Sequence, residues 1–364
     1  MKNVAIFFGG ISVEHDVSVL TGIIVSRTLK NSKKYNPVPV FIDTDGRWYT
    51  GEALFNIDFY KNIDRKKLTG VIFLKRDRTL YRFKKNKLKP FIALSCAINC
   101  MHGENGEDGT LSGIAKAYDI PLCSPDIFSS ALSMDKELQK KFLKGIGVKV
   151  TPCIVFRDNL DEIEKKFSYP VIIKPANLGS SIGIKKADNR RELEEAVLLA
   201  KKYSDKIIAE KYLSGFTEIN CAAYQNSAGD IVVSQLEKPK SKDGVLSFSD
   251  KYCKGDREFP AKTDEKTANK IRKITAKVYK ETGANGIVRI DYMIYNGEII
   301  LNEINSVPGS LSYYLFCPTF TEFTAILEDV IEKTERENNG KSTLLKVYKS
   351  SILEGVGTKA SKRL

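Results

Sequence analysis

One stretch near the end of the chain carries residue types that suit metal and phosphate chemistry. Two alternating runs, 287–295 and 298–304, flank Asn296-Gly297, the strongest short signal for a β-hairpin. A period of two places the polar side chains on one face of each strand. Three oxygen donors and an arginine are costly to bury unless they bind a charged group, and such oxygens suit Mg²⁺ held together with substrate phosphates. The alternative is a surface hairpin with solvated charges. The four residues are Arg289, Asp291, Glu303 and Asn305.

A loop of small residues upstream suits a polyphosphate. A short apolar run ends in Lys174, which supplies a compact positive charge. Glycines in the following loop let the backbone approach phosphates closely, and serine hydroxyls add to the amide donors. The pattern lacks the spacing of a P-loop, and alone it is more often a simple turn. Together with the hairpin it indicates nucleotide binding. The loop residues are Gly179, Ser180, Ser181 and Gly183.

Length and composition place the chain among ordinary globular proteins. With 364 residues, 28% charged and 42% hydrophobic, it is long enough for two or three domains. No apolar run approaches the ~18 residues of a membrane span. The N-terminus enters a Gly-Gly turn after a short apolar stretch, which predicts a first strand and not a signal peptide. Seven cysteines without a CxxC pair indicate a reduced, cytoplasmic protein with no zinc site.

The net charge of +13 raises the question of nucleic-acid binding. Residues 61–90 hold twelve lysines and arginines against two aspartates, so this segment carries most of the excess. Its sequence predicts hairpin strands with solvated faces, and its aromatic residues are not interleaved as a base-stacking surface requires. We therefore expect no nucleic-acid partner and no membrane insertion.

Strands alternate with helices in the first third of the chain, which predicts an open α/β domain. The Gly9 and His102 loops follow strands, the position of ligand loops in such sheets. One helix is expected over 126–145. Strand, helix, strand, helix and strand are expected in turn over 147–212, and the first of these strands is 148–156. The tail after residue 335 is expected to hold a final helix and a frayed end. The predicted fold class is α/β, becoming α+β in the C-terminal part, with an open parallel N-terminal domain (1–123), a central domain (124–213) and a C-terminal domain (214–364).

Both histidines of the chain, His15 and His102, lie in loops beside glycines and carboxylates, which favours a site. At this point several motifs become recognisable in a fixed order over about residues 1–330. Together they resemble the D-alanine–D-alanine ligases of the ATP-grasp superfamily, in which two domains clasp the nucleotide. The motifs are GGISVEHDVS, HGENGEDGTLSG, SMDK, VIIKPANLGSSIG, EKYLSG, DKY, RIDY and NEINSVPG.

The resemblance implies a two-step reaction that serves peptidoglycan precursor synthesis. ATP phosphorylates the carboxylate of a first D-alanine, and the amine of a second amino acid attacks the acyl phosphate. By motif match, Glu14 would hold the first ammonium group, supported by the loop of His15 and Ser18. Ser180 and Tyr252 would join Glu14 in a hydrogen-bonded set that closes a lid and excludes water from the acyl phosphate.

The same resemblance implies a nucleotide set. Lys136 and Lys174 would contact the phosphates, and Glu218 would contact the ribose. The adenine would be lined by a short run that begins at Glu210. The full set is Lys136, Lys174, Ser180, Ser181, Glu210, Lys211, Leu213 and Glu218.

The hairpin acquires specific roles from the resemblance. Asp291, Glu303 and Asn305 would ligate two Mg²⁺ ions, which Mn²⁺ could replace, and so neutralise charge as the phosphoryl group moves. Arg289 and the amide of Gly309 would stabilise the acyl phosphate and the tetrahedral oxyanion.

The second amino acid is the point at which the sequence departs from the family pattern. His102 would lie near its entry, and Lys251 would face its carboxylate, which favours an amine acceptor. The lid segment is shorter than usual, and Tyr314-Leu315 stands where the family commonly has Ser-Leu or Ser-Met. D-Serine therefore stays open as an acceptor, ahead of D-lactate. A third possibility is a non-catalytic ATP-binding regulator. The expected partners are D-alanine, ATP and a second copy of the chain in a homodimer.

Overall fold

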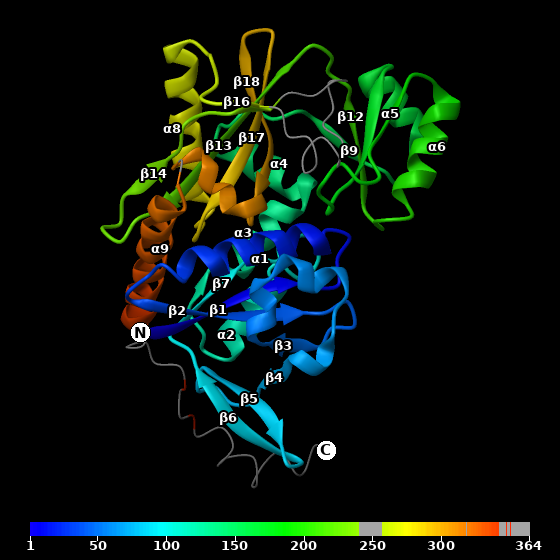
Figure 1. Ribbon diagram of the computed structural model, residues 1–364. Helices are drawn as coiled ribbons and strands as arrows, with labels where there is room; N and C mark the ends of the chain where they lie inside the picture. Colours follow the sequence, from blue (N-terminus) through cyan, green and yellow to red (C-terminus); the bar gives the residue numbers. More distant parts are fainter. Residues whose placement is uncertain (240–256, 318, 342–346, 348–349, 351–364) are drawn as a thin grey trace.

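The N-terminal part of the computed structural model is built on one large sheet (Figure 1). The structure describes residues 1–239, 257–317, 319–341, 347 and 350. In spatial order the strands are β6 (Lys87–Ala93), β5 (Thr79–Lys84), β4 (Thr69–Phe73), β3 (Trp48–Thr50), β2 (Tyr35–Ile42), β1 (Lys2–Gly9), β7 (Cys96–Asn99) and β8 (Leu122–Cys123). The last four are parallel, as expected, whereas β3 to β6 extend the sheet as antiparallel strands.

The strand β1 is apolar from Val4 to Phe8 because its side chains alternate between two faces and both faces are buried. Val4, Ile6 and Phe8 pack into one core with α1 (His15–Leu29) and α9 (Phe320–Lys341). Ala5 and Phe7 pack into a second core with α2 (Thr110–Ala117) on the opposite face. A central strand covered on both faces has no solvated side, so apolar residues follow one another along it.

Two four-stranded antiparallel sheets follow in the central and C-terminal parts of the chain. The central sheet has the order β11 (Lys185–Ala187), β10 (Val171–Pro175), β12 (Ile207–Lys211) and β9 (Cys153–Val155), and is covered by α5 (Leu160–Phe167) and α6 (Arg190–Ala200). The C-terminal sheet has the order β14 (Ile231–Val233), β13 (Thr217–Gln225), β17 (Val288–Tyr295) and β18 (Glu298–Asn305), and packs on α8 (Glu265–Glu281). The short strands β15 (Lys238–Pro239) and β16 (Arg257–Glu258) pair with each other.

The expected β17–β18 hairpin is present. Asn296 and Gly297 have φ values of 50° and 76°, the left-handed conformations that a two-residue type I′ turn requires. Arg289 lies opposite Asn305 and Asp291 lies opposite Glu303 in the register. The sequence pattern predicted that these polar residues share a face of their strands, and the register shows which of them lie opposite one another.

The single helix expected over 126–145 is instead two helices. It divides into α3 (Ile127–Met134) and α4 (Lys136–Gly145) at Asp135, whose backbone is extended. The Asp135 carboxylate accepts the backbone N–H groups of Glu137 and Leu138, so it serves as the N-cap of α4. This break places Lys136 at the first position of a helix.

Other boundaries also differ from the expectation. The strand expected over 148–156 is limited to β9, since Val150 bridges Leu301 of the other sheet. The strand β11 was not predicted, and α9 begins at Phe320, well before the expected final helix. The remaining short elements are 3₁₀ turns: η1 (Glu52–Phe55), η2 (Ile57–Lys61), η3 (Arg65–Lys67) and η4 (Gly309–Leu315). Among the helices of the described residues, none is long and apolar enough to cross a membrane.

Candidate active site

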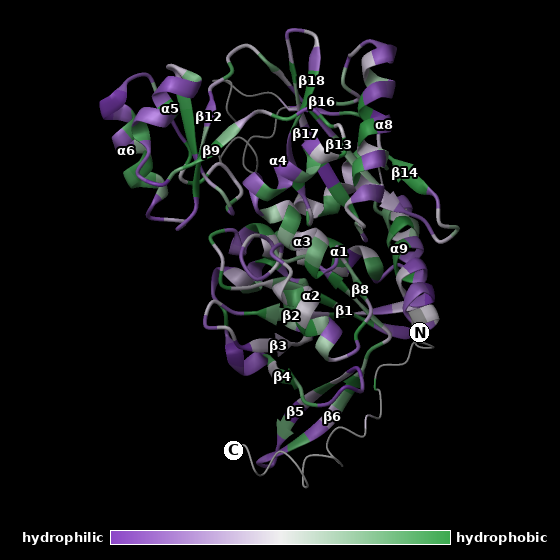
Figure 2. Ribbon diagram, turned by 180° about the vertical axis from the view of Figure 1, so that it is seen from behind, coloured by the Kyte–Doolittle hydropathy of each residue, from purple (hydrophilic) through white to green (hydrophobic). Residues whose placement is uncertain are grey.

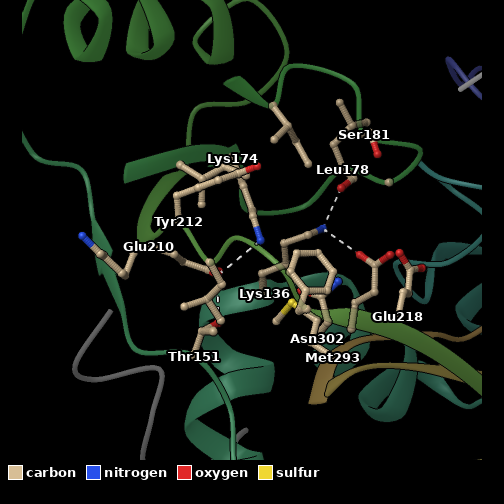
Figure 3. A pocket seen from close by; sticks show the side chains of 17 residues that line it. Lys136, Thr151, Lys174, Leu178, Ser181, Glu210, Tyr212, Glu218, Met293 and Asn302 are labelled. Atoms are coloured by element: carbon tan, nitrogen blue, oxygen red, sulfur yellow. Dashed lines mark hydrogen bonds and ion pairs between the residues drawn. The ribbon is translucent and has the colours of Figure 1, made fainter. Parts of the chain in front are cut away.

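A cavity, partly open to solvent, lies between the central and C-terminal sheets. Residues of β10 and β12 line one side, and residues of β13, β17 and β18 line the other (Figure 3). The cavity therefore lies where the resemblance predicts that two domains clasp a nucleotide. Predicted nucleotide residues that line it are Lys136, Lys174, Ser181, Glu210, Lys211, Leu213 and Glu218.

Glu210 is the charged centre of one wall. Its carboxylate is within 3.2 Å of the amino groups of both Lys174 and Lys140, and it accepts the hydroxyl of Thr151 at 2.8 Å. Burial alone raises the pKa of Glu210, but the two lysines outweigh it and lower this pKa to about 2. The glutamate is therefore ionised and fixed.

Lys136 connects the walls of the cavity. Its amino group donates to the carbonyl of Leu178 at 2.6 Å and lies 3.9 Å from Oε2 of Glu303 (Figure 3). Burial lowers the pKa of Lys136, while Glu303 opposes this change. The backbone N–H of Lys136 donates to Ala176, so the break before α4 is tied to the loop after β10.

The Lys211 side chain is oriented partly away from the cavity, since its amino group donates to the carbonyl oxygens of Ser168 and Tyr169. This leaves the β12 backbone and the segment up to Leu213 at the cavity wall. The apolar wall also includes Ile172 and Met293, which suits the flat face of a base.

Arg289 and Asp291 form a bidentate ion pair. Nε and Nη2 of Arg289 donate to the two carboxylate oxygens at 2.7 and 2.9 Å, and Asn305 donates to Oδ2 of Asp291 at 3.0 Å. Burial lowers the pKa of Arg289, but Asp291 outweighs it, so the pKa lies well above its usual value. Glu303 lies opposite Asp291. This donor set of carboxylate and amide oxygens fits a hard divalent cation.

Glu14 and Ser180 lie far apart in the chain and meet in the structure. The Ser180 hydroxyl donates to Oε1 of Glu14, which is 4% exposed. Two glycines allow the carboxylate to approach backbone: a Cβ at Gly179 would lie 3.1 Å from Oε2 of Glu14, and one at Gly103 would lie 2.9 Å from it. The predicted contact between the first loop and the glycine-serine loop is therefore present.

His15 and Ser18 hold the loop that carries Glu14. Nδ1 of His15 lies 2.7 Å from the carbonyl oxygen of Gly10. The Ser18 hydroxyl accepts the N–H of Gly9 at 2.7 Å and donates to the carbonyl of Cys100 at 2.8 Å. All three contacts are made to backbone, so in this structure these residues support the loop.

His102 lies in the same region, at the end of β7. Its Nε2 is 3.0 Å from the hydroxyl of Thr21, which also accepts the N–H of Ser310. Burial and the nearby charge of Arg289 lower the pKa of His102 to about 3, so the ring is neutral at physiological pH.

Glu107 links the His102 loop to the turn after β18. Its carboxylate accepts the N–H of Gly103 at 2.9 Å and the N–H of Val307 at 3.1 Å. Burial and the charge of Glu14 raise the pKa of Glu107 to about 8. The contact fixes the beginning of the turn that leads to Gly309.

The turn at the start of η4 is strained. Ser310, Leu311 and Ser312 have φ values of 51°, 48° and 49°, in the left-handed region that residues with a side chain rarely adopt. The Ser310 bond to Thr21 and a bond from the N–H of Leu311 to Pro308 hold this conformation. Gly309 directly precedes it.

Tyr314 follows the strained turn, and its ring lies beneath the guanidinium of Arg257, 4.2 Å from the ring centroid. Arg257 also lies 3.5 Å from the carboxylate of Glu237. Leu315 is fully buried and its carbonyl accepts the N–H of Gln235. Lys251 and Tyr252 lie outside the described residues.

Sequence reasoning missed several residues of this site. Lys140 lies one helical turn after Lys136, and this spacing could have indicated that the two share a face. Thr21, Glu107 and Arg257 carried no comparable signal, because their contacts join segments far apart in the chain.

A family model described as D-ala D-ala ligase N-terminus matches residues 3–125, and one described as D-ala D-ala ligase C-terminus matches residues 144–334. The chain belongs to the D-alanine–D-alanine ligase family. The predicted family, the fold class and the assignment to ATP-dependent ligases are thereby confirmed.

Individual relatives are similar over most of their length. The D-alanine–D-alanine ligase of Thermosipho melanesiensis is 35% identical over 347 residues, covering 91% of this chain and 93% of the relative. The crystal structure of the ligase from Helicobacter pylori has a TM-score of 0.77 at 28% identity, covering 92% of this chain and 98% of that chain. The VanG D-Ala:D-Ser ligase of Enterococcus faecalis has a TM-score of 0.78 at 30% identity, covering 92% and 99%.

Proposed function

We propose that this chain joins two D-alanine molecules at the expense of ATP. The γ-phosphoryl group passes to the carboxylate of the first D-alanine, releasing ADP. The amine of the second attacks the acyl carbon, an amide forms, and phosphate leaves with a proton released. The observation that carries this proposal is that the nucleotide cavity and Glu14 form one continuous site. Lys136 and Glu303 line the cavity, and their charged groups lie 3.9 Å apart. Ser180, in the glycine-serine loop that also lines the cavity, donates its hydroxyl to Glu14.

On the nucleotide side, fixed charge supports the proposed roles. Lys136 and Lys174 supply positive charge for the phosphates from two directions, at the start of α4 and on β10. Glu210 keeps the Lys174 amino group in place and presents the β12 backbone to the base. The predicted ribose contact of Glu218 is supported by its position on the opposite wall.

Asp291, Glu303 and Asn305 would hold Mg²⁺, with Mn²⁺ as a substitute. The bound cations supply charge neutralisation for the transferring phosphoryl group. Arg289 would donate its remaining N–H groups to the acyl phosphate, while the bonds from Nε and Nη2 to Asp291 keep the guanidinium oriented. The Gly309 amide, which lies at the start of the strained turn, donates to the oxyanion.

Glu14 binds the ammonium group of the first D-alanine. Its carboxylate is buried and oriented by the Ser180 hydroxyl, so it offers a negative charge at a defined point. The loop that holds it is supported by His15 and Ser18. Closure over this site, in which Tyr252 joins Ser180 and Glu14, keeps water away from the acyl phosphate.

D-Serine is a second candidate for the acceptor. Tyr314 occupies the family's serine position, and Arg257 covers its ring, so the environment of the acceptor carboxylate differs from the family pattern. The likeness to a D-Ala:D-Ser ligase favours the same candidate. His102, Lys251 and Leu315 complete the proposed acceptor set.

The proposed product is a precursor of peptidoglycan, made by a cytoplasmic homodimer whose subunits fold as three domains with the predicted boundaries. Size-exclusion chromatography with light scattering tests the dimer.

The first experiment measures ATP- and Mg²⁺-dependent phosphate release with D-alanine alone, together with the mass of the product. Efficient formation of the D-alanine dimer supports the proposal. Poor turnover with D-alanine that D-serine or D-lactate restores would instead identify a different acceptor. ATP binding without phosphate release for any D-amino acid pair would identify a non-catalytic regulator.

A further inference from the structure

The basic segment of residues 61–90 has no role in the site, and its charges are organised in two ways. Near its base, cations are neutralised: Arg65 pairs with Asp43, and both Arg76 and Arg78 pair with Asp119. Towards the tip of the β5–β6 hairpin, within the described part of the chain, the cations pair with no carboxylate. The tip residues are Arg82, Lys84, Lys85, Lys87 and Lys89.

The register shows how unfavourable this tip is by itself. Arg82 lies directly opposite Lys89, and Lys84 lies directly opposite Lys87. Like charges at directly opposed positions destabilise an antiparallel pair. All three lysines are exposed, and Lys85 adds a further cation in the turn. Such an arrangement is stabilised when an anionic surface lies against it.

The other face of the hairpin tip is apolar. Phe83 lies opposite Leu88, and the Phe83 side chain is 68% exposed. Ile72, on the neighbouring strand β4, is 39% exposed. Figure 2 shows hydrophilic and hydrophobic residues along the same hairpin. The tip thus has one cationic face and one apolar face, and it projects from the end of the molecule opposite α8 (Figure 1).

We propose that the β5–β6 tip is a peripheral docking surface for an anionic lipid bilayer. The tip meets the bilayer end-on, so that Phe83 on one face of the hairpin enters the headgroup region while the lysines on the other face reach the lipid phosphates beside it. Docking at this end leaves the nucleotide cavity, which lies between the other two sheets, open to its substrates. No membrane-spanning segment is involved.

The arrangement favours a lipid surface over a nucleic acid. Base stacking requires an aromatic ring beside the cations. Phe83 lies on the opposite face from Arg82, Lys84, Lys87 and Lys89. The ring of Phe91 is covered by the Arg82 guanidinium, which lies 4.0 Å from the ring centroid. The tip also projects from the molecule, so it can reach a broad, deformable bilayer surface without the other described parts of the protein touching it.

The test uses the full-length protein and vesicle sedimentation. The probes are phosphatidylglycerol–phosphatidylcholine vesicles and pure phosphatidylcholine vesicles at low salt. Binding is expected for the first probe only and should weaken as salt is added. Each lysine or arginine near an anionic surface contributes about fivefold to the partition constant, so the variant Arg82→Gln, Lys84→Gln, Lys87→Gln, Lys89→Gln should bind on the order of 600-fold more weakly.

A matched control removes four charges elsewhere. The control uses four of the five α8 lysines, Lys266, Lys270, Lys273 and Lys280, which are exposed at the other end of the molecule. Their replacement by glutamine should change vesicle binding by less than about tenfold. Phe83→Ser should weaken binding several-fold without changing its salt dependence. Ligase activity in solution should be unaltered in all three variants.

Three outcomes would overturn the proposal. One is equal loss of vesicle binding in the two charge variants, which would assign the effect to net charge alone. Another is full vesicle binding by the hairpin variant. The third is binding of an oligonucleotide, but not of vesicles, that disappears in the hairpin variant.

Discussion

The hydroxyl of Thr21 lies 3.0 Å from Nε2 of His102 and accepts the backbone N–H of Ser310 at the same distance. Thr21 is 1% exposed, so its single hydroxyl proton needs a buried acceptor. Within the described residues His102 Nε2 is that acceptor, which places the imidazole proton on Nδ1. Thr21 therefore connects the tautomer of the His102 imidazole to the strained turn after Gly309.

Replacing Thr21 by Val keeps the shape and removes both hydrogen bonds. The Ser310 N–H and His102 Nε2 then lack a partner, which should cost about 2 kcal/mol of stability. We expect a higher KM for the acceptor and a lower kcat, with the KM for ATP nearly unchanged. Thr21→Ser should restore both kinetic constants. Steady-state kinetics of the two variants, with the acceptor varied, is the measurement. Equal kinetics for the valine variant and the native protein would contradict the inference that Thr21 positions His102 and the turn at Ser310 for the acceptor.

His102 gives the stability of the protein a defined pH dependence. Its pKa falls from 6.5 to about 3 on folding, so the unfolded chain binds a proton between these values that the folded chain does not bind. Stability therefore rises with pH across this window and is lost as pH falls below about 6.5. Between pH 6.5 and 4 the contribution is about 3 kcal/mol.

The check is urea unfolding of the native protein and of His102→Gln at several pH values in this window. Glutamine does not titrate, so the two curves should approach each other as pH falls. Parallel curves would show that His102 is free to protonate in the folded state.

The sequence predicted the β17–β18 hairpin and the shared face of its polar residues because both depend on local signals, alternation and an Asn-Gly turn. It did not predict the break at Asp135, because the local pattern continues and only the cap and the tie from Lys136 to Ala176 interrupt it. Contacts such as that of Glu107 with Val307 join residues two hundred positions apart, and no periodicity indicates them.

The cluster around Glu210 allows a double-variant test. Lys140 is 4% exposed and contacts both Glu210 and Thr151. Lys140→Met removes one of two cations from a buried carboxylate and should destabilise the protein by about 3 kcal/mol or more. Glu210→Gln in the same chain removes the charge that was left without this cation, so the double variant should be more stable than the sum of the two single losses predicts.

Thermal unfolding of the two single variants and the double variant measures the coupling. ATP affinity is the second readout, since Lys174 loses its oriented carboxylate contact in both Glu210→Gln chains. Additive losses would mean that Lys140 stabilises the fold without acting through Glu210.

Tyr314 is the residue whose replacement tests the acceptor assignment. Its ring supports Arg257, and its neighbours include the charges of Arg289 and Glu237. Tyr314→Ser restores the family pattern and releases Arg257 from the ring. We expect the KM for the second amino acid to change by about tenfold, since a cation–π contact and the packing around it are worth roughly 1–2 kcal/mol. The KM for ATP should stay within about twofold, because the nucleotide cavity is lined by other residues.

Tyr314→Phe is the matched control for this change. It keeps the ring beneath Arg257 and removes only the hydroxyl, so it separates contact through the ring from a direct hydrogen bond to the acceptor. A serine variant that differs from native and a phenylalanine variant that does not would assign the effect to the ring and Arg257. An acceptor KM that is unchanged in Tyr314→Ser would show that this residue lies outside the acceptor site.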